Sequence, residues 1–310
     1  MYSLLSIVIP TRDRGALLLR AVDALLDQTT DAGAQVEVIV VDDGSAEDIK
    51  APLMAVAARR EQADRLRYLF QPRKGPAAAR NLGIREARGE LVLFLGDDIV
   101  ACPGLLREHV RAHTLEYPGQ EFAVLGLADL APQFCQTRFA LWWRRWNFRY
   151  WLLLEGRRSP DYSFFYTSNL SLKRGFLLQN GMFDEEFRYA AYEDSELGYR
   201  LARRGLELVF KPQANAYHWH EICLRSACQR MRTRGEAHDL FVQKTGMLGI
   251  SRIWMALGSG PWMHPVVIRR LFGLANWLQP TWATELISIA VLMYWFQVGR
   301  GKYPPLHGLL

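Results

Sequence analysis

Three pairs of acidic residues punctuate the chain in a fixed order, and the first two follow strand-like apolar runs that end at residues 41 and 95. The third pair opens a helix-like stretch that continues to residue 204. Ligands of open α/β sheets bind outside the carboxyl ends of the strands, so we expect these carboxylates to converge on one rim of such a sheet. The pairs are Asp42-Asp43, Asp97-Asp98 and Glu193-Asp194.

Strand-like and helix-like segments alternate over the first 120 residues. Continuous apolar runs predict buried strands at 4–9, 36–41, 66–70 and 91–95. Apolar residues at helical spacing, or Pro at a helix start, predict helices at 17–28, 49–63, 76–87 and 103–117. This alternation predicts an α/β fold with a single open, mostly parallel, Rossmann-like sheet flanked by helices.

The pattern changes further along the chain. Residues 129–165 crowd Trp and Arg side chains together, which indicates either core packing or an insertion that faces an acceptor or a membrane. A further strand is predicted at 206–210, and from residue 225 the pattern is helical. We therefore expect a main domain at 1–235, with halves at about 1–128 and 129–235, followed by a C-terminal helical extension at 236–310.

The basic charge is concentrated in this last segment. The chain carries a net charge of +6, but residues 225–310 hold ten Lys or Arg against three acidic residues, so residues 1–224 sum to about −1. A nucleic-acid-binding protein would need a basic stripe on its main domain. We therefore expect no nucleic-acid partner, and the basic tail fits an anionic membrane surface better.

Five of the ten Trp also lie in the tail, beside Arg and Lys at a spacing that suits a lipid interface. The longest uncharged apolar run there, 286–296, has 11 residues, whereas a membrane-spanning helix needs about 20. We expect peripheral attachment to the inner face of the plasma membrane, with packing on the main domain or a dimer interface as the alternative. The five are Trp254, Trp262, Trp277, Trp282 and Trp295.

Two features predict a cytoplasmic location. The four cysteines form no CxxC and no zinc spacing, and such scatter suits a reduced cytosolic protein. The chain enters its first strand within a few residues and carries no basic n-region, so we expect no signal peptide.

Five motifs, in this order and spacing, resemble family 2 glycosyltransferases, which are inverting enzymes of the GT-A fold. The resemblance covers about residues 4–235, and a looser similarity lies at 166–174. It implies a GT-A sheet and a metal-dependent hexosyltransferase that moves a sugar from a nucleoside-diphosphate sugar to a glycan or lipid-linked acceptor, in cell-envelope or polysaccharide assembly. The five motifs are residues 6–11, 41–45, 75–81, 94–98 and 192–201.

The resemblance divides the acidic pairs among tasks. A carboxylate just past a strand can accept hydrogen bonds from a base or a ribose hydroxyl, and the second residue of the first pair, Asp43, is the stronger candidate for the base. Free N–H groups at the start of the 76–87 helix can meet a nucleotide. The candidates for nucleotide-sugar binding are Pro10, Thr11, Asp42, Asp43, Arg80 and Asp97.

A divalent cation, Mg²⁺ or Mn²⁺, is the expected cofactor, because it neutralises charge on a leaving diphosphate. Gly96 replaces the first acid of the family's D-x-D, so we expect Asp98 to be the direct ligand. The resemblance implies a histidine near here as a further metal or diphosphate contact, and His218 is the expected one, with an ordinary buried or surface histidine as the alternative. His218 and His220 alternate along a strand-like segment and should therefore point to opposite faces.

The third pair is expected to supply the catalytic base. Inversion needs the acceptor hydroxyl to lose its proton as it attacks, and one carboxylate within hydrogen-bond reach suffices. The resemblance assigns this task to Asp194, with Glu193 beside it. It also places Ser168 and Asn169 on the acceptor side.

Two other classes of protein fit part of the pattern. A nucleotidyltransferase on a similar sheet would need a Gly-rich basic loop after the first strand, and residues 11–15 offer a weak version. A degenerate, non-catalytic sugar-nucleotide-binding module docked at the membrane would account for Gly96. His109 and His113 lie four residues apart without the acid of a metal motif, so we expect them at the surface or in the core of their helix.

Overall fold

In the computed structural model of the chain, the described residues are 4–30, 33–247, 264–277 and 282–306. They form two compact units, each described here by itself. The first comprises Met1–Ala131, Phe148–Arg188 and Glu193–His220, and the second Pro132–Asn147, Tyr189–Tyr192 and Glu221–Leu310. The predicted domain boundary near residue 235 stays a prediction.

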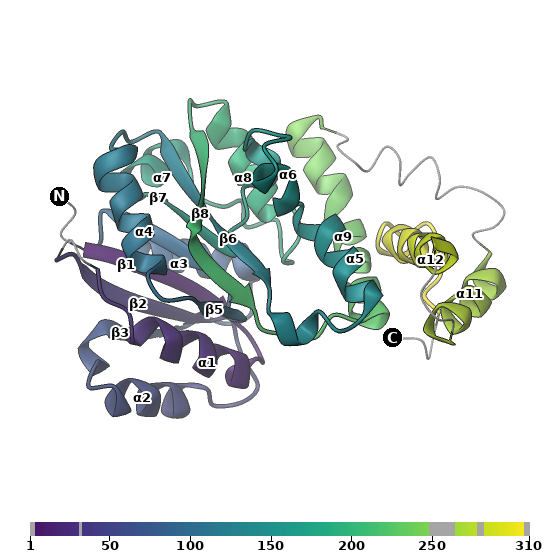
Figure 1. Cartoon of the computed structure of the whole chain (residues 1–310), viewed down its shortest axis with the longest axis horizontal. Coiled ribbons are helices and arrows are strands. Elements are labelled where there is room, and N and C mark those ends of the chain that lie inside the picture. The colour runs from purple at the N-terminus through teal and green to yellow at the C-terminus, as the bar shows by residue number, and fades with distance from the viewer. Residues whose placement is uncertain (1–3, 31–32, 248–263, 278–281, 307–310) are drawn as a thin grey trace. The chain divides into compact units, whose positions relative to one another are not determined.

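The first unit is built on one sheet with the strand order β3-β2-β1-β4-β7-β6-β8-β5 (Figure 1). β1 pairs in parallel with β2 and β4, β2 with β3, and β6 with β8, whereas β7 is antiparallel to both its neighbours and β5 is antiparallel to β8. The strands are β1 (Leu4–Thr11), β2 (Gln35–Asp42), β3 (Leu66–Phe70), β4 (Leu91–Leu95), β5 (Ile99–Ala101), β6 (Phe122–Leu130), β7 (Asn169–Lys173) and β8 (Glu207–His218).

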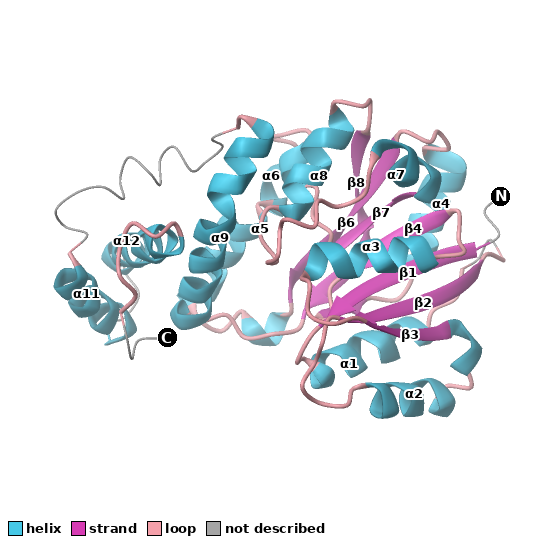
Figure 2. Ribbon diagram, turned by 180° about the vertical axis from the view of Figure 1, so that it is seen from behind, coloured by secondary structure: helices cyan, strands magenta, loops and turns pink. Residues whose placement is uncertain are grey.

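Helices cover both faces of this sheet: α4 lies in front of it in Figure 1, and α3 lies in front of it in the reverse view of Figure 2. The predicted open, mostly parallel sheet flanked by helices is thus confirmed. The helices of this unit are α1 (Gly15–Leu26), α2 (Lys50–Arg59), α3 (Pro76–Glu86), α4 (Leu105–Arg111), α6 (Tyr150–Leu154), α7 (Arg174–Asn180) and α8 (Glu193–Ala202), whereas α5 (Arg138–Phe148) belongs almost entirely to the second unit. A π-helical turn, η2 (Ala112–Glu116), continues α4.

The apolar patterns explain the core of this unit. The central apolar residues of β1, Leu5, Ile7, Val8 and Ile9, are fully buried, as a strand covered on both faces requires. Leu18, Val22 and Leu25 of α1 fall on one buried stripe at helical spacing. α3 packs very closely on β1, since a Cβ on Gly83 would lie 2.3 Å from a methyl carbon of Val8.

Three strands were not predicted from the sequence: β5, β6 and β7. The strand expected at 206–210 is instead the first part of the 12-residue β8, which contains a bulge. Gly126 of β6 pairs with Lys211, and the next residue, Leu127, pairs with Asn215, so three residues of β8 lie outside the ladder at this point. The bulge interrupts the apolar pattern and hides the length of the strand.

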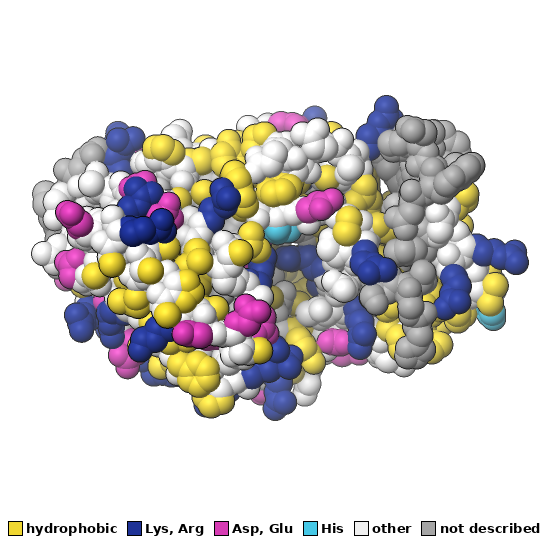
Figure 3. All heavy atoms as spheres, turned by 90° about the horizontal axis from the view of Figure 1, so that it is seen from below, with side chains coloured by type: hydrophobic (Ala, Val, Ile, Leu, Met, Phe, Trp, Pro, Cys, Tyr) yellow, Lys and Arg dark blue, Asp and Glu magenta, His cyan; other side chains and the backbone are white. Residues whose placement is uncertain are grey.

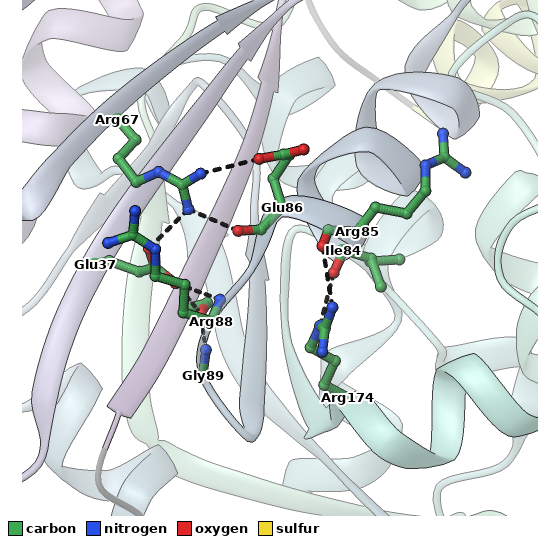
Figure 4. Close-up of polar contacts among 9 residues, drawn as sticks. Glu37, Arg67, Ile84, Arg85, Glu86, Arg88, Gly89 and Arg174 are labelled. Carbon is green, nitrogen blue, oxygen red and sulfur yellow. Dashed lines mark hydrogen bonds and ion pairs between the residues drawn. The ribbon is translucent and has the colours of Figure 1, made fainter.

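A network around Glu37 joins the amino ends of β1, β2 and β3 (Figure 4). Glu37 Oε1 accepts hydrogen bonds from Ser6 Oγ at 2.6 Å and from the backbone N–H of Arg88 at 2.7 Å. Glu37 Oε2 accepts from Arg67 at 3.0 Å, and Arg67 also donates to the carboxylate and the carbonyl of Glu86. We call Ser6, Glu37, Arg67, Glu86 and Arg88 the Glu37 network. It links the strands at their amino ends, which lie opposite the end of the sheet that carries the acidic pairs.

Arg174, the first residue of α7, binds the carboxyl end of α3 (Figure 4). Its guanidinium donates to the carbonyl oxygens of Ile84 at 2.8 Å and Arg85 at 3.0 Å. Carbonyls in the last turn of a helix lack intrahelical donors, so a cation there satisfies them and complements the helix dipole.

In the second unit, α9 (Leu224–Thr245) packs along α12 (Trp282–Gly299), and α11 (Pro265–Trp277) packs on α12. A Cβ on Gly235 would lie 2.0 Å from the carbonyl oxygen of Phe296, and one on Gly299 would lie 1.9 Å from that of Arg232. Glycine at both positions therefore lets the two backbones touch.

Trp295 lies inside this packing with 1% of its surface exposed, so the expectation that its indole meets lipid is wrong. The side chains of Trp254, Trp262, Trp277 and Trp282 lie outside what the structure describes. Among the described helices, none is long and apolar enough to cross a bilayer. On the face drawn in Figure 3, basic, acidic and hydrophobic side chains are interspersed.

Candidate active site

Asp97 and Asp98 lie in the turn that follows β4, at the carboxyl-end rim of the sheet. Asp98 Oδ2 lies 2.8 Å from Nδ1 of His220, and Asp98 Oδ1 lies 3.8 Å from Nδ1 of His218. One ligand atom from each of these three residues lies within 4.8 Å of the other two. A carboxylate and two imidazoles at this spacing are a donor set that fits a divalent transition-metal ion.

The expectation that the two histidines face opposite ways is wrong. β8 ends at His218, which lies opposite Ile99 in the antiparallel pairing of β8 with β5. The N–H of Trp219 still donates to the carbonyl of Asp98 at 2.8 Å, in register with this pairing, and His220 lies in a bend beyond the end of the strand. Alternation holds only within a strand, and His220 therefore turns back to the same carboxylate.

Two neighbours orient this cluster. The ring of Phe148 stacks on that of His218, with 4.5 Å between the centroids. A Cβ at Gly96 would lie 2.8 Å from Asp98 Oδ1, so any other residue there would push the carboxylate aside. The departure from D-x-D thus leaves room for Asp98 to face the histidines.

Arg14, from the loop after β1, bridges the acidic pair. It donates to Asp97 Oδ1 at 2.6 Å and to Asp98 Oδ2 at 3.0 Å. Thr11 Oγ1 donates to Asp97 Oδ2 at 2.9 Å, and Pro10 beside it is partly exposed at the end of β1. The first loop and the second acidic pair thus form one polar surface.

Burial and neighbouring charges separate the two carboxylates. Burial raises the pKa of Asp97 to about 6, with the charge of Asp98 adding to the rise and Arg14 opposing it. Burial also disfavours ionised Asp98, but the neighbouring imidazoles of His218 and His220 and the charge of Arg14 outweigh it and hold the pKa of Asp98 well below its usual range. Asp98 is therefore the residue that keeps its negative charge, as a metal ligand must.

The first acidic pair organises the loop before α3. Asp43 Oδ1 accepts hydrogen bonds from Gln71 Nε2 at 2.8 Å and from the backbone N–H of Lys74 at 2.7 Å, and Asp43 Oδ2 accepts from Gly75 N–H at 2.8 Å. Asp42 Oδ2 accepts from the Tyr68 hydroxyl at 2.6 Å. Asp43 therefore holds the turn at Gly75, whose φ of +103° suits glycine and which leads into Pro76 and α3.

The third pair divides into a buried and an accessible carboxylate. Glu193 is 3% exposed, and its Oε1 accepts from Arg80 of α3 at 3.0 Å. Asp194 is partly exposed and accepts from the backbone N–H of Ser195 at 2.7 Å. Burial and the charge of Asp194 raise the pKa of Glu193 to about 7, although Arg80 lowers it. The buried Arg80, predicted to meet a nucleotide, instead pairs with Glu193.

On the expected acceptor side, Ser168 is partly exposed, whereas Asn169 is fully buried. The Asn169 amide donates to the carbonyls of Leu127 and Ala214, and its oxygen meets a ring nitrogen of His109 at 2.8 Å. All its polar atoms are thus engaged inside the sheet. The expectation that Asn169 faces an acceptor is wrong for this structure.

Sequence reasoning missed Arg14 and His220 as members of the site. A signal existed for each: Arg14 belongs to the basic loop after the first strand, and His220 to a short His-rich segment. Such a loop is also typical of nucleotidyltransferases, and strict alternation along a strand predicts the far face for His220.

The comparisons with known proteins agree with the expected family. Residues 6–176, more than half of the chain, match the family described as Glycosyl transferase family 2. Validoxylamine A glucosyltransferase of Streptomyces hygroscopicus subsp. limoneus is 32% identical over 230 residues, which cover 66% of this chain and 49% of that protein. Chondroitin synthase of Escherichia coli is 29% identical over 243 residues, which cover 69% of this chain and 34% of that protein.

The chain therefore spans about half the length of the first relative and about a third of the second. In fold it is similar to a mannosyltransferase from Pyrobaculum calidifontis solved with GDP-Man and Mn²⁺, with a TM-score of 0.65, 17% identity, and coverage of 96% of this chain and 87% of that one. The predicted GT-A fold is confirmed. By its sequence match and its fold, the chain belongs to glycosyl transferase family 2.

Proposed function

We propose that this protein transfers a sugar from a nucleoside-diphosphate sugar to an acceptor hydroxyl, with inversion at the anomeric carbon. The observation that carries the proposal is the meeting of Asp98, His218 and His220 at the rim of the sheet, in a chain of this family. The accessible Asp194, with buried Glu193 beside it, adds a candidate base.

Asp98, His218 and His220 would hold a divalent cation, and the donor set favours Mn²⁺ over Mg²⁺. Magnesium prefers an all-oxygen octahedron that retains several waters, whereas imidazole nitrogen suits later first-row ions. The mannosyltransferase of similar fold was solved with Mn²⁺. When bound, such a cation would neutralise the charge that grows on the leaving diphosphate.

Asp194 would take the proton of the acceptor hydroxyl as that oxygen attacks. Its partial exposure leaves it reachable, while its hydrogen bond with Ser195 N–H fixes it at the start of α8. Glu193, whose pKa is raised to about 7, would be partly protonated at neutral pH, which would reduce the repulsion between two adjacent negative charges. Arg80 would position Glu193 from α3.

The donor nucleotide would lie along the rim formed by the first two acidic pairs. Asp42 and Asp43 would meet its nucleoside, and Asp97 its ribose, with Thr11 and Pro10 lining the end of β1. Arg14 adds a guanidinium that is already within hydrogen-bond distance of Asp97 and Asp98 and could meet a diphosphate. Ser168 remains the candidate on the acceptor side.

Thermal-shift measurements on the full chain test the donor and the metal together. UDP-sugars and GDP-sugars, each with Mn²⁺, Mg²⁺ or EDTA, should raise the melting temperature most with Mn²⁺, because a ligand that binds only the folded state stabilises it. A donor-hydrolysis assay with the responding sugar should show metal-dependent release of nucleoside diphosphate. A protein that binds the donor but releases none would be a binding module.

The acceptor is proposed to be a glycan or lipid-linked glycan of an envelope or polysaccharide pathway, met at the inner face of the plasma membrane. α11 exposes Val266, Val267 and Leu274 beside the exposed Arg269 and Arg270. Apolar and basic side chains together suit an anionic lipid surface, where each basic residue is worth about 1 kcal/mol.

Flotation with anionic vesicles tests this attachment. The double change Arg269→Glu and Arg270→Glu should lower the vesicle-bound fraction at least tenfold. The matched change Arg203→Glu and Arg204→Glu, at two adjacent exposed arginines of the first unit, should not. Equal flotation of the two double variants would exclude α11 as the attachment site.

A further inference from the structure

A buried polar face of β7 has no part in the proposed chemistry. Asn169, Ser171 and Lys173 alternate along the strand and are at most 1% exposed. Opposite them, His109 of α4 and His113 of η2 are completely buried. A polar layer inside a core is costly unless every group has a partner, so its hydrogen bonds indicate what it does.

The bonds of this layer run in one direction. The amide nitrogen of Asn169 donates to two carbonyls, so its oxygen must accept from Nε2–H of His109, 2.8 Å away. The Nδ1 atom of His109 is then an acceptor for the Ser171 hydroxyl at 2.7 Å, and Ser171 Oγ accepts from His113 Nε2 at 2.9 Å. Burial lowers the pKa of His109 to about 4, which keeps its ring neutral and this direction fixed.

The chain of bonds ends at the bulge of β8. Asn169 Nδ2 lies 3.1 Å from the carbonyl oxygen of Leu127 and 2.8 Å from that of Ala214, the last of the three residues that lie outside the ladder. A Cβ on Gly126 would lie 2.2 Å from Asn169 Nδ2 and 2.4 Å from Ala214 O. Glycine at 126 is therefore what admits the amide to the bulge.

The bulge sets the register of the strand that delivers both histidines. After it, β8 pairs regularly with β6 from Asn215 to His218, and His218 lies opposite Leu130. A different number of residues outside the ladder would shift every later side chain and, at a one-residue slip, turn His218 to the other face.

We infer that the buried chain His113–Ser171–His109–Asn169 is a positioning device: it locks the β8 bulge and thereby places His218 and His220 against Asp98. The inference rests on the proposed metal site. The four residues touch neither donor nor acceptor; they act through the backbone of β8. A substitution that breaks the bond between His109 and Asn169 should therefore weaken metal binding. A substitution elsewhere in α4 that lowers the free energy of unfolding by the same amount should not.

Two amide substitutions at His109 separate the two ends of this chain. A Gln side chain reaches as far as Nε2 and can still donate to Asn169, whereas an Asn side chain reaches only as far as Nδ1 and meets Ser171 alone. Leu106→Ala, a purely apolar cavity in the same helix, controls for destabilisation, since Leu106 is fully buried. Mn²⁺ binding to the full-length proteins is measured by the loss of the free-ion electron paramagnetic resonance signal, and stability by urea unfolding.

Wild type and His109→Gln should bind Mn²⁺ within about twofold of each other. His109→Asn should bind about 10-fold more weakly, the lower end of the losses seen when outer-shell partners of metal ligands are removed. Leu106→Ala should bind as wild type despite lower stability. If His109→Asn does not fold, Asn169→Ala, which removes the amide from the bulge itself, should weaken Mn²⁺ binding in the same direction.

Two outcomes are distinguishable failures. If wild type binds Mn²⁺ and His109→Asn, or Asn169→Ala in its place, binds it equally well, the layer is only structural and the inference is wrong. If wild type itself binds no Mn²⁺, the proposed metal site fails and the inference falls with it.

Discussion

Two Glu–Arg pairs in the first unit, each with a buried glutamate, have the same ion-pair distance and opposite shifts in the pKa of that glutamate. Glu37 meets Arg67 and Glu193 meets Arg80, each at 3.0 Å. Glu37 also accepts bonds from the Ser6 hydroxyl and a backbone N–H, and these outweigh burial and lower its pKa. Glu193 is buried beside the charge of Asp194, and its pKa rises to about 7.

This difference shows that the groups around a Glu–Arg pair, rather than the pair itself, decide the role of the glutamate. Glu37 has partners on both oxygens, whereas Glu193 Oε2 has no hydrogen-bond partner among the described residues. A satisfied, ionised carboxylate stabilises a fold; a carboxyl with a raised pKa beside a second acid is typical of a functional site. The Glu37 network is thus expected to affect stability alone, and the Glu193–Asp194 pair to affect catalysis.

The largest effect expected is that of Asp194→Asn. Loss of a general base should lower the transfer rate by about 10²- to 10⁴-fold, while donor binding and stability stay close to wild type, because Asp194 is partly exposed. Steady-state transfer and donor titration check this. If the variant keeps more than a few per cent of the wild-type rate, Asp194 is not the catalytic base.

Asp98→Ala should abolish the Mn²⁺ dependence of donor binding. It should also lower the affinity for nucleoside diphosphate by at least about 10-fold, since a bound cation would bridge carboxylate and phosphate. Asp97→Ala should do less, because Asp97 lies outside the group of three metal-capable residues. The measurement is calorimetric titration of nucleoside diphosphate with and without Mn²⁺. Equal, cation-independent affinities in wild type and Asp98→Ala would contradict the metal site.

The sequence predicted one part of this site well because its carboxylates follow apolar runs. A strand end is visible in a single sequence, and a parallel sheet brings such ends to one rim, so Asp97 and Asp98 were found. The meeting of His220 with Asp98 depends on where β8 leaves its ladder, and hydrogen bonds between distant strands decide that.

The misassigned Asn169 teaches the same lesson from the other direction. A strand that alternates Asn, Ser and Lys with Leu reads as half exposed, whereas β7 is buried on both faces. Its polar side chains are balanced by two histidines some sixty residues earlier in the chain. Periodicity reports the chemistry of a face and not the partner that covers it.

Glu37→Gln tests the other side of the comparison. Breaking a fully buried ion pair costs about 3 kcal/mol or more, but Arg67 is partly exposed and would keep its bonds to Glu86, so the expected loss is below about 3 kcal/mol. Urea unfolding at pH 7 should report this loss, while the Mn²⁺ and donor affinities of the folded variant match wild type. A change in Mn²⁺ affinity would show that the Glu37 network at the amino ends of the strands is coupled to the metal site at their carboxyl ends.

The smallest effect expected is a difference in pH dependence, and its sign is opposite for the two glutamates. A folded-state pKa raised above the unfolded value of 4.5 means that the stability due to protonated Glu193 is complete below pH 4.5 and is lost as pH rises through about 7. A lowered pKa means that the contribution of Glu37 is present above pH 4.5 and is lost as pH falls through its folded value.

Urea unfolding from pH 4.5 to 6 therefore separates the pairs. Relative to Glu193→Gln, which cannot titrate, wild type should lose roughly 1.5 kcal/mol of stability across this window, since one pKa unit corresponds to about 1.4 kcal/mol. Relative to Glu37→Gln, wild type should gain stability over the same range. Parallel curves for wild type and Glu193→Gln would mean that Glu193 is ionised in the folded protein, and Arg80 would then be holding it as Arg67 holds Glu37.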